Sequence, residues 1–194
     1  MGRTSDAKER ILDSALALIH ERGYANVGVE DIMQAAKVGK SSFYHFFKSK
    51  EKLGEAVVDE YTRRTCEDLF DRAFAGDISP LQRFHRLTSM LQTDTRPIVG
   101  CLGGNGAAEH TNNSEPLRVK TDGLLDQIRG RFEDAFADAV SDMDLHPDTP
   151  TSDLAAASVA YLQGLLLLCR VKQSWEPMTT LGPMVEHLWH PYLV

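Results

Sequence analysis

The sequence predicts an all-α protein of about nine helices. Along nearly the whole chain of 194 residues, apolar residues recur at the three- and four-residue spacing of amphipathic helices. Glycine and proline stand between these periodic segments, where they end one helix and start the next. No window shows the sustained alternation of apolar and polar residues that is typical of a half-buried strand. The pattern therefore disfavours every fold that depends on a sheet.

Each predicted helix has its own start and stop signals. The first begins after Ser5, whose hydroxyl can cap a helix, and ends at Gly23. The fifth begins where Ser79 precedes Pro80, because proline is favoured in the first turn of a helix. The nine predicted helices cover residues 5–23, 29–39, 40–47, 48–76, 80–93, 101–111, 114–143, 152–173 and 178–190.

Composition indicates a globular protein that works in the cytoplasm. The chain is 42% hydrophobic and 25% charged, which suffices for a substantial core. The most apolar segment, 154–169, is interrupted by Ser158, Gln163 and Gly164, so we expect no membrane span. The N-terminus is polar and has no apolar core of a signal peptide. We therefore expect a soluble, cytoplasmic protein.

The residue types that perform catalysis or bind metals form no recognisable set. His187 and His190 are three residues apart but have no third ligand nearby, so we expect no metal. No Ser-His-Asp, HExxH or paired-carboxylate motif is present, so we expect neither an enzyme nor a cofactor. An odd number of well-separated cysteines fits a reducing compartment rather than a disulfide framework: Cys66, Cys101 and Cys169.

Charge is distributed unevenly along the chain. The net charge is −7, yet residues 1–65 are close to neutral and the acidic excess lies in residues 66–194. Within a span of 16 residues in the first part, a single acid, Glu51, accompanies five lysines: Lys37, Lys40, Lys48, Lys50 and Lys52. Phosphate binding depends on the local field at the contact surface, so this cluster is compatible with a nucleic-acid partner.

The stretch GKSSFYHFF (39–47) raises two alternatives. A nucleotide-binding P-loop requires a glycine five positions before Gly39, where this chain has Gln34, and it requires a preceding strand. Neither condition is met, so we reject a nucleotide site. The other alternative is the second helix of a helix-turn-helix, which enters the major groove of DNA.

The face of the 40–47 helix supports this second alternative. At about 100° per residue, Phe43, Phe46 and Phe47 fall on one side and are expected to pack inward. Hydroxyl, imidazole and ammonium groups occupy the opposite side, where they can bond to base edges and phosphates. This outer face consists of Ser41, Tyr44, His45 and Lys48, with Lys40 and Ser42 at its edges.

The run GYANVGVEDIMQAAKVGKSSFYHFFKSKEKL (23–53) resembles the helix-turn-helix signature of the TetR family of bacterial transcription regulators. The resemblance lies in the Gly-aromatic opening, the D-I-x-x-A-A-x-V helix, the K-S-S-F-Y-H-F-F helix and the S-K-E-x-L start of the next helix. It implies a DNA-binding head over residues 1–50 and an effector-binding and dimerisation body over residues 51–194. The implied function is a repressor that binds a palindromic operator as a homodimer and is released by a small effector.

Carried over residue by residue, the resemblance implies which groups contact DNA. It assigns base or phosphate contacts to Lys40, Ser41, Ser42, Tyr44 and His45, and a phosphate contact to Lys50. Lys48 lies on the same outer face. Gly28 stands near the place where many members have threonine or serine, and we expect it to cap the next helix with its own backbone N–H free.

The body is expected to dimerise and to bind the effector. The last two predicted helices carry more apolar surface than one core can bury, which favours a homodimer through them. The segment GCLGGNGAAEH (100–110) resembles a family branch in which it borders the effector site. We expect a small, mainly apolar effector with a few polar anchors, bound by Leu87, Leu91, Cys101, Asn105, His110, Phe132, Tyr161 and Leu165.

Cys101 leaves one alternative open. It precedes a predicted helix, where the helix dipole lowers the pKa of a thiol and enhances its reactivity. Some members of the family sense electrophiles or oxidants through a cysteine, so Cys101 could serve a thiol-based repressor instead of lining a ligand site. A buried, unreactive Cys101 is the simpler expectation.

Overall fold

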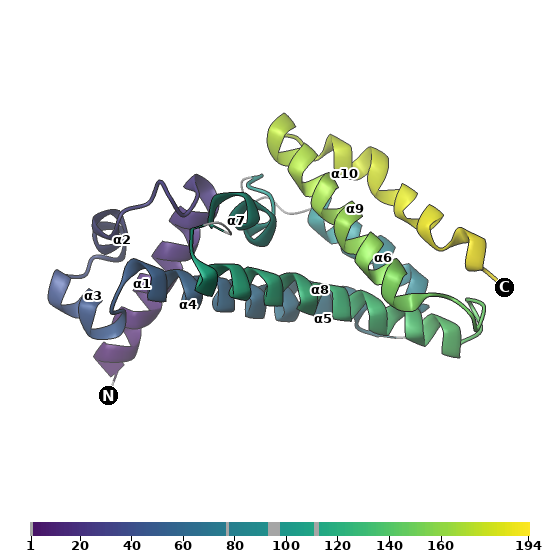
Figure 1. Cartoon of the computed structure of the whole chain (residues 1–194), viewed down its shortest axis with the longest axis horizontal. Coiled ribbons are helices and arrows are strands. Elements are labelled where there is room, and N and C mark those ends of the chain that lie inside the picture. Colours follow the sequence, from purple (N-terminus) through teal and green to yellow (C-terminus); the bar gives the residue numbers. More distant parts are fainter. Residues whose placement is uncertain (1, 77, 93–97, 111–112) are drawn as a thin grey trace. The chain divides into compact units, whose positions relative to one another are not determined.

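The computed structural model is all-α, which confirms the predicted fold class. It describes residues 2–76, 78–92, 98–110 and 113–194, with only the backbone described at 2–5, 80, 81 and 110. Figure 1 traces the chain through these elements. Their bounds are α1 Gly2–Arg22, α2 Val29–Ala36, α3 Lys40–Phe46, α4 Lys50–Arg64, η1 Thr65–Phe70, α5 Asp71–Phe74, α6 Pro80–Gln92, α7 Leu102–His110, α8 Glu115–Ser141, α9 Thr151–Lys172, α10 Glu176–Leu181, η2 Gly182–Leu188 and η3 His190–Tyr192.

Two predicted helices are subdivided in the structure. The helix predicted over 48–76 consists of α4, the π-helical turn η1 and α5, which follow one another without a break. The last predicted helix is α-helical only in α10 and continues as the 3₁₀ turns η2 and η3. Each of these turns has a proline in its first positions, and proline lacks the N–H that an α-helical ladder needs. Counted as continuous segments, the described residues form the nine predicted helices.

The chain divides into two compact units. The first unit contains Met1–Arg63 and Cys101–Leu124, and the second contains Arg64–Gly100 and Leu125–Val194. The first unit therefore includes most of α4, all of α7 and the start of α8 in addition to α1, α2 and α3. A boundary at residue 50 between a DNA-binding head and a body stays a prediction, since it concerns function rather than compactness.

The first unit is built on a core in which α1 contacts both α2 and α3. Its fully buried side chains include Ile11 of α1, Ile32 of α2, Phe43 of α3 and Leu53 of α4. Leu102 of α7 belongs to the same core although it lies far along the sequence. The first unit is therefore held by apolar burial from five helices, and that burial is the main source of its stability.

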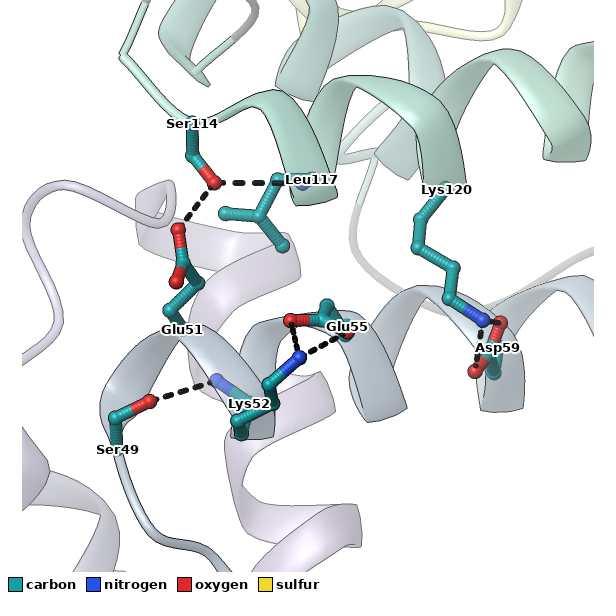
Figure 2. Close-up of polar contacts among 8 residues, drawn as sticks. All are labelled: Ser49, Glu51, Lys52, Glu55, Asp59, Ser114, Leu117 and Lys120. Atoms are coloured by element: carbon teal, nitrogen blue, oxygen red, sulfur yellow. Dashed lines mark hydrogen bonds and ion pairs between the residues drawn. The ribbon is translucent and has the colours of Figure 1, made fainter.

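The start of α8 is fastened to α4 by polar contacts, which Figure 2 shows. The Ser114 hydroxyl accepts a hydrogen bond from the N–H of Leu117 at 3.3 Å and donates one to the Glu51 carboxylate at 2.6 Å. One turn further on, the Lys120 ammonium lies 2.7 Å from the Asp59 carboxylate. Ser114 thus caps α8 and joins it to α4 with a single side chain.

Gly54 lies inside α4 at a close approach to its neighbours. A Cβ there would stand 2.8 Å from Cε2 of Tyr24 and 3.0 Å from Cδ2 of Leu117. Gly54→Ala is therefore expected to lower the free energy of unfolding by about 1–3 kcal/mol. Denaturant unfolding measures the change.

Gly123→Ala is the matched control for that substitution. Gly123 lies in α8 of the same unit, and a Cβ there would meet nothing within 4 Å. Alanine should raise the free energy of unfolding at this position by up to about 1 kcal/mol, because it is the better helix former. Stabilisation by both substitutions would contradict the close packing of Gly54.

The second unit is organised around aromatic rings. Phe84 of α6 stacks on Phe132 of α8 with centroids 5.1 Å apart and planes inclined by 10°. Phe136 and Trp189 contact the same ring of Phe84, at 4.8 and 4.7 Å between centroids. Since such contacts add to the burial of large apolar side chains, this cluster is the core of the unit.

One helix of the described part, α9, is long and apolar enough by length and composition to cross a membrane. Its most apolar window has a mean hydropathy of 1.7, and 39% of it is buried. A core helix of a soluble protein passes the same test, so this property is weak evidence of a span. The buried residues of α9, among them Leu154, Leu162 and Leu165, recur at helical spacing along one face.

Candidate DNA-binding surface and effector cavity

The turn between α2 and α3 depends on Lys37. This residue adopts the left-handed conformation, with φ 54° and ψ 48°, and its N–H donates to the carbonyl of Gln34 at 3.2 Å. The N–H of Val38 donates to the carbonyl of Met33 at 3.0 Å. Glycine usually occupies such a position, so the sequence pattern predicts the end of this helix near Gly39 instead. Gly39 is the N-cap of α3 and has extended backbone angles.

The two sides of α3 differ in burial: the phenylalanines face the core and the polar residues face solvent. Phe43 is 0% exposed and Phe47 is buried, while Phe46 is partly buried against the same core. On the other side Tyr44 is 41% exposed. The remaining outer residues are exposed at Lys40, Ser41, His45 and Lys48 and half-buried at Ser42. The structure thus brings six of the predicted DNA-contacting residues onto one surface of α3 and its C-terminal end, which we call the α3 outer face.

The exposed rings of the α3 outer face rest on the buried ones. The ring of Tyr44 meets Phe43 edge to face at 5.2 Å between centroids, and His45 meets Phe46 in the same way at 4.8 Å. The Lys48 ammonium lies 3.5 Å from the carbonyl of Tyr44, in the last turn of α3. These contacts restrict the side chains before any partner arrives, which reduces the entropic cost of binding.

Lys50 is placed differently from the other predicted contacts. Its ammonium lies over the ring of Tyr24, 4.3 Å from the centroid, and the side chain is half-buried. Burial lowers the pKa of Lys50, while the Glu109 carboxylate acts in the opposite direction. Glu109 belongs to α7 and also lies 3.4 Å from the N–H of Ala25. No pattern in the sequence predicts that Tyr24 and Glu109 act on Lys50, because both are distant from it along the chain.

The expectation that the N–H of Gly28 is free is wrong. Gly28 does cap α2, with φ −83° and ψ 159°, but its N–H donates to the Asp31 carboxylate at 2.8 Å. Asp31 is the third residue of the helix, the position from which a side chain reaches back to the cap in a capping box. The Gly28 backbone therefore has its partner within the chain.

The second unit contains a small cavity. The empty space in and around it is about 290 Å³, part of which is open solvent. Four residues predicted to bind the effector come together in its wall: Leu87, Phe132, Tyr161 and Leu165. Six further lining residues are not among the predicted ones: Phe84, Thr88, Ser158, Leu162, Gly182 and Val185. Helical spacing from Leu154 and Leu165 would have placed Ser158 and Leu162 on the buried face of α9.

The other predicted effector residues do not line this cavity. Leu91 lies on α6 outside the lining. Cys101 and Asn105 belong to the first unit, where the N–H of Asn105 donates to the carbonyl of Cys101 at 2.9 Å. The side chain of His110 lies outside the described residues. Their role in effector binding stays a prediction.

The three cysteines are free and buried. Cys101 is 5% exposed directly before α7. Burial raises the pKa of the Cys66 and Cys169 thiols, which disfavours their reactive thiolates. In the described part of the chain, no group of three or more His, Cys, Asp or Glu side chains is arranged to hold a metal ion.

Both parts of the chain match known family models. Residues 11–57 match the model described as bacterial regulatory proteins of the tetR family. Residues 80–182 match the tetracyclin repressor-like C-terminal domain. The first match spans α2, α3 and the α3 outer face, and the second spans the cavity residues of α6, α8 and α9.

Relatives and solved structures agree with these matches. The chain is 30% identical over 176 residues to the transcriptional regulator AcuR of Cereibacter sphaeroides, covering 89% of this chain and 80% of AcuR. It is 27% identical over 181 residues to the transcriptional repressor DhaR of Mycobacterium sp. strain GP1, covering 92% and 89%. A crystal structure of the regulatory protein TetR from Rhodobacter sphaeroides superposes with a TM-score of 0.87 at 28% identity, covering 94% of this chain and 98% of the other.

The family of these proteins has a defined general activity. Its members are non-enzymatic regulators of transcription that bind DNA through a helix-turn-helix, typically as homodimers. The combination of two family matches, the shared fold and the helix-turn-helix surface shows that this chain belongs to the TetR family of bacterial transcription regulators.

Proposed function

We propose that the protein is a ligand-responsive repressor that binds a pseudo-palindromic operator in the cytoplasm. The observation that carries the proposal is the α3 outer face, on which hydroxyl, imidazole and ammonium groups are exposed above a fully buried Phe43. Short polar and cationic side chains on a helix suit the major groove, where they reach base edges and phosphates. The relative DhaR is named as a repressor.

The proposed homodimer forms through α9 and the segment α10–η2. Large apolar side chains are exposed on these elements, with Val171 74% exposed, and the others are Leu167, Leu168 and Met184. A two-fold axis through this apolar surface would bury it and give the dimer two copies of α3. Two recognition helices read half-sites about 34–36 Å apart, one turn of DNA, which predicts a palindromic site.

Release by an effector is the proposed switch, and the cavity of the second unit is the proposed binding site. A ligand that binds more tightly to the form with unsuitable spacing of its two α3 helices shifts the population toward that form. A coupling of about 1–3 kcal/mol is typical and would change operator affinity roughly 5–150-fold.

Selection of bound sequences from random double-stranded DNA tests the proposal. The expected product is a pseudo-palindrome bound by a dimer, with dimerisation checked by sedimentation at micromolar concentration. The same DNA is then titrated in the presence of a panel of metabolites, one of which is expected to release it. A stable monomer, or failure to enrich any sequence, would refute the proposal.

The substitution Cys101→Ser distinguishes the ligand-responsive repressor from the thiol-based alternative. Burial of Cys101 limits the access of electrophiles and oxidants to its thiol. In the described residues, nothing favours a thiol-based switch over ligand binding. The variant is expected to keep its response to the effector. Loss of the response would assign the switch to Cys101.

A further inference from the structure

Three hydroxyl groups belong to the wall of the cavity, and two of them already have partners. The Thr88 hydroxyl donates to the carbonyl of His85 at 3.0 Å, one turn back along α6. The Tyr161 hydroxyl donates to the carbonyl of Leu181 at 2.7 Å. Ser158 is 1% exposed, and its hydroxyl oxygen is buried with no hydrogen-bond partner among the described residues. Ser158 therefore has the one unused hydroxyl donor of the described lining.

The unpaired state of Ser158 is unusual for its position. A serine inside a helix can donate to the carbonyl four residues back, which here belongs to Leu154. Ser158 makes no such bond, whereas Thr62 of α4 does, to the carbonyl of Val58 at 2.7 Å. Buried polar groups almost always have a partner, so an unpaired one in a cavity wall points to something that binds there.

The rest of the lining selects against charge. None of the ten lining residues is an acid, a lysine, an arginine or a histidine. Burial raises the pKa of Tyr161, which keeps its hydroxyl neutral. An ion that entered the cavity would lose its hydration without gaining a countercharge, which is unfavourable.

The apolar part of the lining favours a compact ligand. Phe84 and Phe132 stack at the cavity wall, and three leucines and a valine also line it. The enclosed part of the cavity is small, so a compact ligand suits it better than a large one.

We propose that the effector is a small, uncharged and largely apolar molecule with a hydrogen-bond acceptor, and that Ser158 donates to this acceptor. The inference rests on the proposed function, because it names the ligand class of the cavity assigned there to the effector. Ser158 is then the specificity-determining residue of the site, since the other hydroxyls of the lining are engaged with backbone carbonyls.

Three probes of similar size separate the chemistries. Acetophenone carries a carbonyl acceptor, cumene replaces that carbonyl by a hydrocarbon group, and benzoate carries a charge. Calorimetric titration of the full chain without DNA is expected to give tighter binding of acetophenone than of cumene by roughly threefold to tenfold, the net worth of one neutral hydrogen bond. Benzoate is expected to bind more weakly than cumene.

Ser158→Ala is expected to make the affinities for acetophenone and cumene equal. It removes a hydroxyl without a partner, so thermal unfolding of the free variant should match that of the unsubstituted protein. Thr88→Val is the matched control, because it removes a hydroxyl of the same lining that already has a partner. This control should retain the preference for acetophenone.

Several results would overturn the inference: a preference for acetophenone that survives Ser158→Ala, binding of benzoate at least as tight as that of acetophenone, or no binding of any probe. Such a failure differs from a failure of the proposed function. The titrations contain no DNA, so they can fail while an operator is bound and released by another ligand. They can also succeed while no operator is found.

Discussion

Tyr44→Ala is expected to weaken operator binding by about 1–3 kcal/mol, the usual effect of losing one good contact in the groove. Tyr44 is 41% exposed on the α3 outer face, and its ring rests on Phe43 rather than inside the core. The free energy of unfolding should therefore change by less than about 1 kcal/mol. Fluorescence anisotropy with the selected operator measures the first quantity, and denaturant unfolding measures the second.

Tyr44→Phe is the control that identifies the contacting group. It keeps the ring on Phe43 and removes only the hydroxyl. If the hydroxyl makes the contact, this variant binds as weakly as Tyr44→Ala. If the ring makes it, the variant binds as well as the unsubstituted protein. Unchanged operator affinity in Tyr44→Ala would show that the α3 outer face does not meet DNA as proposed.

Phe43→Ala is expected to lower the free energy of unfolding by about 3–5 kcal/mol. Phe43 is 0% exposed in the core formed by α1, α2, α3, α4 and α7, so its removal leaves a cavity that the surrounding helices cannot fully close. Such a loss is a large part of the stability of an ordinary domain. Denaturant unfolding, followed by circular dichroism, measures it.

Phe46→Ala provides the comparison for that result. Phe46 is on the same helix but only partly buried, so less apolar surface returns to water when it is removed. The loss should be clearly smaller than that of Phe43→Ala. Equal losses would contradict the deeper burial of Phe43 than of Phe46.

Local patterns predicted the helices well because each carries its own signals. The helix predicted over 40–47 is α3, Lys40–Phe46. The spacing of its phenylalanines also predicts which side of the helix is buried. The end of α2 was missed, because the left-handed residue there is Lys37 rather than a glycine. The π-helical turn η1 had no recognisable signal in the sequence.

Contacts between distant segments could not be read from the sequence. The unpaired hydroxyl of Ser158 depends on what α6 and α8 leave open beside α9, and sequence spacing contains no such information. Cys101 and Asn105 were grouped with the effector residues through a motif resemblance, whereas the structure places them with the compact first unit. Periodicity predicts faces, but packing decides which faces meet.

The capping of α2 has a consequence for how the protein would respond to ionic strength. Glu30 and Asp31 place negative charge at the first turn of α2, and Asp31 occupies the Gly28 N–H. A DNA phosphate is therefore repelled from this helix end, although a bare helix N-terminus attracts anions. Cations released from DNA on binding would be displaced by ammonium groups such as those of Lys40 and Lys48. The slope of log affinity against log salt concentration would then reflect the number of lysines that contact phosphates, without a contribution from the first turn of α2.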